Sequence, residues 1–292
     1  SLAIYGQSAQ SGELIANGGN GGAGIGGQQR KSGSNITING GVVKATGGRF
    51  AAGIGGGMLN TPPGMGGPIS YESDGFNITI NGGTVTAKGG DDGAGIGGGM
   101  NGSGYNITIH GGTVTANGGQ FGAGIGGGQN GNGSNIIIND GTVTANGGQS
   151  GGAGIGGGTS MSGAGQKGDG FNITINGGKV TANGGGHNAS GIGGGMEGSG
   201  SNIIIAATLL VKADAFNPPM TVIPNTGTDL AGTLNGKQHV TTEPIIITYG
   251  EYITVSPEFE SGDNVAYGTY TFTAADRWAD NYEFIGFYKE ST

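Results

Sequence analysis

Residues 106–128 decide the fold of this chain, and they read NITIHGGTVTANGGQFGAGIGGG. The stretch holds three short apolar blocks (residues 106–109, 113–116 and 123–125) with glycine-rich turns between them. The blocks recur along the chain, and such internal repetition is typical of a solenoid or a propeller. The first block begins again at Asn35, Asn77, Asn135, Asn172 and Asn202, and the third block begins again at Ala23, Ala52, Ala94, Ala153 and Ser190.

The spacing of the blocks selects one architecture. The second block starts seven residues after the first, as from Asn106 to Thr113, and a whole unit takes about 29 residues. A propeller blade needs four strands and a longer period. A βαβ solenoid needs one helix per repeat, and no 3.6-residue apolar period is present. The sequence therefore predicts an all-β, right-handed parallel β-helix, a three-faced solenoid with one strand per block.

Strand alternation assigns the side chains to an inside and an outside. Ile107 and Ile109 should point inward with Val114 and Ile125, while the residues between them point outward. We expect the third outer face to be nearly bare glycine backbone. We expect the asparagines that begin the first block to form an amide ladder along the stack; they are Asn35, Asn77, Asn106, Asn135, Asn172 and Asn202.

The composition supports a packed fold with few chemically active groups. The 292 residues include 75 Gly, eight Pro and no Cys, so neither a collagen period nor a disulfide or zinc–thiolate scaffold fits. Residues 1–213 carry eight acidic and eight basic side chains, whereas residues 214–292 carry eleven acidic and three basic ones. Without a basic stripe or an apolar run of membrane length, we expect no nucleic-acid partner and no membrane insertion. The N-terminus lacks the pattern of a signal peptide.

The repeat ends near Ala213, which divides the chain into a β-helix (1–213) and an acidic, aromatic C-terminal segment (214–292). That segment holds 12 of the 19 aromatic residues. Strands are expected at 241–249, 252–257, 267–273 and 282–289, forming a β-rich cap or a separate module. Trp278 is either a core residue of this segment or a platform for a sugar ring.

Two insertions interrupt the repeat at the same corner, between the third block and the next first block. They are residues 58–74 and 159–169, three coils apart, or about 14 Å at the spacing of β-strands. Insertions on one edge of a solenoid often mark its binding face, although they can also be tolerated ornaments. Phe76 and Phe171 are expected to pack at this corner. The candidate contact residues of the groove are Met58, Met65, Tyr71, Glu72, Asp74, Met100, Tyr105 and Lys167.

The pattern Asn-Ile-Thr-Ile-x-Gly-Gly-Thr-Val-Thr-Ala-x-Gly-Gly, followed by Gly-Ala-Gly-Ile-Gly-Gly-Gly, resembles the glycine-rich repeats of bacterial cell-surface proteins. Those proteins are usually described as adhesin-like or carbohydrate-binding. The resemblance covers about residues 13–213 and implies an extracellular or cell-surface location. The chain is more distantly similar to the pectate-lyase-type β-helix, but it lacks that family's clustered calcium-binding aspartates.

Three functions remain open at this point. The first is a monomeric binding or adhesion module, or a rigid stalk, that contacts glycans at the loop-walled corner. The second is a polysaccharide lyase or hydrolase, which we do not expect because His110, His187 and His239 cannot be paired with a nucleophile and no carboxylate pair stands out. The third is ice binding through paired threonines of the second block. No cofactor is expected, and calcium would bind only adventitiously.

Overall fold

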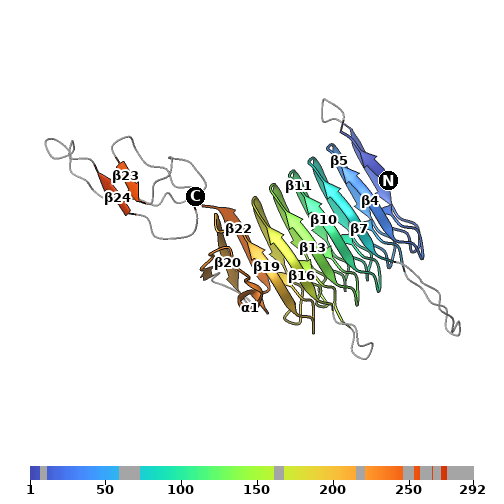
Figure 1. Ribbon diagram of the computed structural model, residues 1–292. Helices are drawn as coiled ribbons and strands as arrows, with labels where there is room; N and C mark the ends of the chain where they lie inside the picture. Colours follow the sequence, from blue (N-terminus) through green and yellow to red (C-terminus); the bar gives the residue numbers. More distant parts are fainter. Residues whose placement is uncertain are drawn as a thin grey trace.

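The computed structural model describes residues 1–6, 12–58, 73–160, 168–214, 221–245, 253–256, 265 and 271–274. In this part of the chain the strands of successive coils lie side by side along one axis (Figure 1). They pair in parallel with the equivalent strands of the neighbouring coils and form three long sheets. The protein is a parallel β-helix, as the sequence predicted.

Each block of the repeat contributes to one sheet. Sheet A is made of β1 (Leu2–Ile4), β4 (Gly33–Ile38), β7 (Gly75–Ile80), β10 (Gly104–Ile109), β13 (Gly133–Ile138), β16 (Gly170–Ile175) and β19 (Gly200–Ile205). Sheet B begins with β2 (Glu13–Asn17), β5 (Val42–Thr46), β8 (Thr84–Lys88), β11 (Thr113–Asn117), β14 (Thr142–Asn146) and β17 (Lys179–Asn183). Sheet C is made of β3 (Ile25–Gly26), β6 (Ile54–Gly55), β9 (Ile96–Gly97), β12 (Ile125–Gly126), β15 (Ile155–Gly156) and β18 (Ile192–Gly193).

The register stacks identical apolar side chains into a continuous core. Ile107 pairs with Ile78 on one side and Ile136 on the other. Ile107, Ile109 and Ile125 are 0% exposed and Val114 is 1% exposed. The inward set predicted from strand alternation is therefore confirmed. Because each coil covers the apolar side chains of the next, the stack buries a core that one coil could not bury alone.

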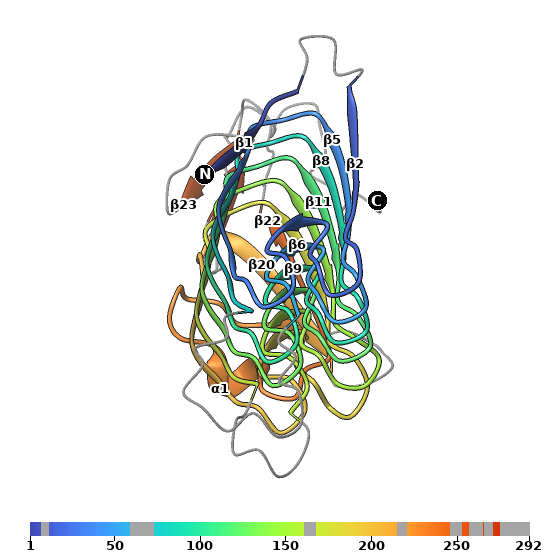
Figure 2. The same cartoon turned by 90° about the vertical axis from the view of Figure 1, so that its right-hand side faces the viewer.

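Sheet C differs from the bare outer face that the glycines were expected to form. In Figure 2, β6 and β9 lie between the two long sheets, and the glycines of residues 53–57 and 95–99 are buried. A Cβ added to Gly95 would lie 2.7 Å from the Asn117 nitrogen of sheet B. A Cβ added to Gly104, at the start of β10, would lie 2.1 Å from the Gly126 oxygen of sheet C. The expectation was wrong because these glycines allow three backbones to meet inside the molecule.

Residues 221–245 cover the C-terminal end of the stack. The strand β22 (His239–Pro244) lies between β17 and β20 (Leu209–Asp214) and is antiparallel to both, and β21 (Thr221–Ile223) pairs with the far edge of β20. The single-turn helix α1 (Ala231–Leu234) buries Leu234 completely. The Asp229 carboxylate accepts hydrogen bonds from the Ala231 N–H (2.9 Å) and the Ile203 N–H (2.8 Å). These bonds lower the pKa of Asp229, and the bond from Ala231 has the largest effect. The bond from Ile203 connects the segment 221–245 to β19.

Two further strands, β23 (Ile253–Ser256) and β24 (Thr271–Ala274), form an antiparallel pair. The strand β23 falls within the expected range 252–257, β24 overlaps the expected range 267–273 and ends one residue beyond it, and β22 overlaps the expected range 241–249. The strand expected at 282–289 lies outside the described residues.

Candidate functional site

A row of asparagines runs along the outer face of sheet A, as predicted. From Asn77 onward, each side-chain Nδ2 donates to the Oδ1 of the asparagine one coil earlier, and every link is between 2.8 and 3.2 Å long. Each of the four interior amides uses one N–H and one oxygen lone pair in the ladder, so a second N–H and a second lone pair on each of them lie outside the ladder bonds. The ladder consists of Asn35, Asn77, Asn106, Asn135, Asn172 and Asn202.

The backbone of these asparagines explains why the ladder faces outward. Asn106 has φ 54°, and the other members of the ladder have φ between 49° and 55°. Asparagine tolerates this left-handed conformation better than other residues with a side chain. The conformation breaks the strand alternation, because Tyr105 is only partly buried and Asn106 is exposed before the buried Ile107. Two successive side chains per coil therefore reach the surface of sheet A.

Removing one ladder amide tests how much the row stabilises the stack. We expect Asn106→Ala to lower the free energy of unfolding by about 2 kcal/mol, because it deletes two amide hydrogen bonds and places alanine in the left-handed region. Asn106→Gly should cost about 1 kcal/mol less, since glycine adopts this conformation without strain. Chemical denaturation of the two variants measures both values. Equal losses for the two variants would show that backbone strain plays no part.

The side chains just before the asparagines form an aromatic row. Phe76 and Tyr105 occupy the same register position on β7 and β10, and their rings stack with centroids 5.0 Å apart and planes 2° apart. Phe171 occupies the same position on β16. Phe76 and Phe171 lie at the start of the strands that follow the two insertions, residues 58–74 and 159–169. Residues 59–72 and 161–167 of these insertions lie outside the described residues, so the loop-walled groove stays a prediction.

The predicted contact residues are placed differently from one another. Tyr105 faces outward in the aromatic row. Met100 is partly exposed, whereas Met58 is only 4% exposed. The Asp74 carboxylate accepts a hydrogen bond from the Ser103 N–H (2.7 Å), which gives this side chain a structural role between two coils. The candidates Met65, Tyr71, Glu72, Lys167 and Trp278 lie outside the described residues.

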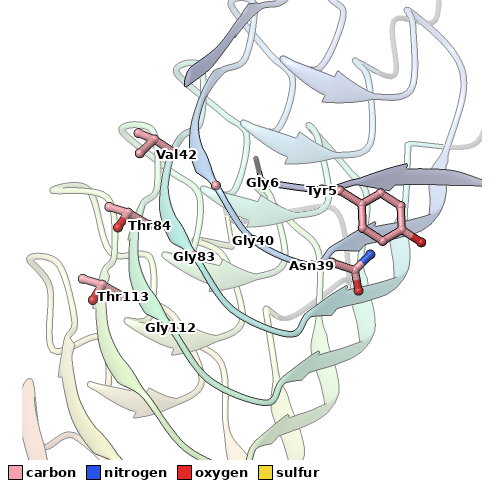
Figure 3. Close-up of a pocket in the computed structure, with 10 residues that line it drawn as sticks. Tyr5, Gly6, Asn39, Gly40, Val42, Gly83, Thr84, Gly112 and Thr113 are labelled. Carbon is pink, nitrogen blue, oxygen red and sulfur yellow. The ribbon is translucent and has the colours of Figure 1, made fainter. Parts of the chain in front are cut away.

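A groove of about 500 Å³ lies at a different corner, where sheet A turns into sheet B near the N-terminus (Figure 3). Its floor is glycine backbone from three successive turns. Tyr5 is 74% exposed. It lies on one side of the groove, and a row formed by Val42, Thr84 and Thr113 lies on the other. No sequence pattern predicted this groove, because its floor is glycine backbone without side chains.

Five stretches of the chain match the family model of the beta helix repeat, at residues 36–58, 78–100, 107–129, 136–159 and 173–196. The chain carries beta helix repeats. No curated protein and no solved structure matches it.

The beta helix repeats share the residues that build the coil and differ at the aromatic row. Each matched stretch begins at the first buried isoleucine of a strand in sheet A, such as Ile78 in β7 or Ile107 in β10. The aromatic-row residue of the strand therefore lies just before the matched stretch. The ladder asparagine is present in each coil, but the position before it changes from coil to coil. In chain order this position holds Ser34, Phe76, Tyr105, Ser134, Phe171 and Ser201.

The beta helix repeats contain two further side-chain ladders that we did not predict from the sequence. One follows the first block, where Asn81 donates to Asn39 (2.7 Å) and Asn176 donates to Asn139 (2.8 Å). His110 belongs to this row, and its Nδ1 lies 3.1 Å from the Asn139 Nδ2. The other follows the second block and joins Asn117, Asn146, Asn183 and His239 through contacts of 2.7 to 3.0 Å. The recurrence of asparagine at these positions was the available signal.

The paired threonines of the second block are in register on sheet B. Thr113 pairs with Thr84 and Thr142, and Thr115 pairs with the equivalent threonines of the same two neighbours. Lys179 continues the first row beyond Thr142. Ice binding through this face stays a prediction.

One carboxyl group of the beta helix repeats is buried away from the aromatic row. Asp92 is 7% exposed. It occupies the position in its coil that Phe50 and Phe121 occupy in the coils before and after it, because the backbone carbonyl of each of the three residues accepts the corresponding backbone hydrogen bond. Burial raises the pKa of Asp92 from 3.8 to about 6, the Asp91 carboxylate adds to the rise, and Arg49 opposes it. No group of three or more metal-ligating His, Asp or Glu side chains occurs among the described residues. Nor does the described part of the chain contain a helix with the length and apolarity needed to cross a membrane.

Proposed function

We propose that this chain is a binding or adhesion module of a bacterial cell-surface protein and contacts glycans where sheet A begins. The observation that carries the proposal is the partly exposed Phe76–Tyr105 stack beside the asparagine ladder. Binding sites commonly combine apolar or aromatic surface with a few well-placed polar groups. The stacked coils supply a rigid support for such a surface.

The chemistry of the row suits a sugar. A pyranose ring has C–H groups on its faces and hydroxyl groups around its edge. The aromatic rings offer apolar surface to the C–H groups, and the ladder amides of Asn77 and Asn106 offer both donors and acceptors to hydroxyl groups. The extracellular location and the role in adhesion belong to the same proposal and rest on the resemblance of the repeats.

Loss of one ring should reveal whether this surface binds. We expect Tyr105→Ala to reduce retention on an array of bacterial, plant and host glycans by about tenfold or more, because aromatic side chains dominate the binding energy of many sites. Tyr5→Ala is the matched control, since it removes the tyrosine of the groove in Figure 3, which lies where sheet A turns into sheet B and is called the apex groove below. Thermal unfolding of both variants shows whether the fold is kept.

The two variants also separate the alternatives. Loss of binding with Tyr5→Ala and full retention with Tyr105→Ala would place the site in the apex groove and contradict our assignment. Absence of glycan binding by the intact protein would contradict the proposed function and favour a stalk.

A further inference from the structure

The aromatic row has one gap. Along sheet A, Tyr105 pairs with Ser134, and Ser134 pairs with Phe171, all at the same outward register position. Ser134 is partly exposed and its side chain is far smaller than a ring. The row therefore places an aromatic residue on each side of a position where a ring is missing.

The dimensions of the gap follow from the sheet. Neighbouring strands are about 4.8 Å apart, so Tyr105 and Phe171 are attached to backbones about 9.6 Å apart. Within the same row, Phe76 and Tyr105 are on adjacent strands and their ring centroids are 5.0 Å apart. A single ring above Ser134 would lie about as far from each neighbour as Phe76 lies from Tyr105.

We propose that the space above Ser134 holds one pyranose ring of a glycan, between Tyr105 and Phe171. This inference rests on the proposed function and specifies the unit that is recognised. The faces of the sugar ring contact the two aromatic side chains. Its edge meets the ladder amides of Asn106, Asn135 and Asn172, which follow the three row residues directly and are exposed.

The polar rim distinguishes a sugar from a flat aromatic guest. In the ladder Asn135 donates to Asn106 (3.2 Å) and accepts from Asn172 (3.1 Å), which leaves one N–H and one lone pair on its amide. A pyranose can use both through neighbouring hydroxyl groups. A phenyl ring can use neither, so it would gain only the aromatic contacts.

The direct test is to fill the space from within. Ser134→Tyr inserts a ring that completes the stack and occupies the position of the sugar. Ser34→Tyr is the matched control, because Ser34 lies at the same register position beside Phe76 but outside the gap. We expect Ser34→Tyr to bind the glycan array like the wild type, and Ser134→Tyr to lose about tenfold or more in apparent affinity.

The outcomes separate this inference from the proposed function. Loss of binding with Tyr105→Ala and retention with Ser134→Tyr would overturn the pyranose slot and leave the glycan-binding surface in place. Absence of binding by the wild type would overturn both. Ser134→Leu, which fills the same space with a smaller side chain, repeats the test if Ser134→Tyr unfolds at a lower temperature. The last measurement is a titration with benzyl alcohol. If the wild type binds benzyl alcohol and Ser134→Tyr does not, the space above Ser134 holds a flat aromatic ring instead of a pyranose.

Discussion

Gly126→Ala is expected to lower the free energy of unfolding by more than about 4 kcal/mol, or to prevent folding. Gly126 has φ 133°, a conformation that residues with a side chain rarely adopt. A Cβ at this position would lie 2.0 Å from the Gly156 oxygen of the next coil, and that atom is backbone in the middle of sheet C. Neither a rotamer change nor a small side-chain shift can relieve the contact. Circular dichroism during thermal and chemical unfolding measures the loss.

Gly111→Ala is the control for this prediction. Gly111 lies in the turn between sheets A and B, and the nearest atom to an added Cβ is the Asn81 oxygen at 3.6 Å, an ordinary contact distance. We expect its free energy of unfolding to stay within about 0.5 kcal/mol of the wild type. A Gly126→Ala protein as stable as the Gly111→Ala protein would contradict the interior position of sheet C.

The sequence was sufficient for the repeat and for the core. Ile107, Ile109, Val114 and Ile125 recur at constant offsets, and only a stack in register buries such a set. The position of sheet C could not be derived in the same way. A glycine that faces solvent and a glycine that admits a neighbouring backbone look alike in a sequence, and the contact of Gly95 with Asn117 depends on how the coil closes.

The candidate site was only partly predictable for a related reason. The ladder followed from the recurrence of asparagine, and Tyr105 was among the predicted contact residues. Phe76 and Phe171 were instead expected to pack at the corner. The left-handed φ of Asn77 and Asn172 (both 54°) brings the residue before each of them to the outer face. That conformation is set by the backbone, so simple alternation along the strand misses it.

Asp92→Asn is expected to make the protein more stable above pH 6 and to remove part of its pH dependence. In the folded protein burial, with help from Asp91, raises the pKa of Asp92 from 3.8 to about 6. Between these two values the folded state binds more protons at this site than the unfolded state does. The free energy of unfolding therefore falls as the pH rises from about 4 to 6.

The size of the effect follows from the shift. A rise of two pKa units corresponds to a contribution of roughly 3 kcal/mol to the free energy of unfolding. This contribution is fully present below the pKa of Asp92 in the unfolded state and is lost above its pKa in the folded state. Asparagine has no charge to bury, so the unfolding curves of the variant and the wild type should diverge between pH 4 and 7, with the variant more stable at the higher pH. Urea denaturation at several pH values measures the difference between the two curves.

Asp91→Asn provides the matched comparison, because its side chain is 61% exposed and lies 3.5 Å from the Arg49 guanidinium. Exposed ion pairs contribute little, so stability at neutral pH should change by less than about 1 kcal/mol. Removing the Asp91 charge also removes one cause of the raised pKa of Asp92, so the fall in stability with pH should become smaller without disappearing. Parallel curves for Asp92→Asn and the wild type would show that the Asp92 carboxyl is hydrated in solution and that its pKa is not raised by burial.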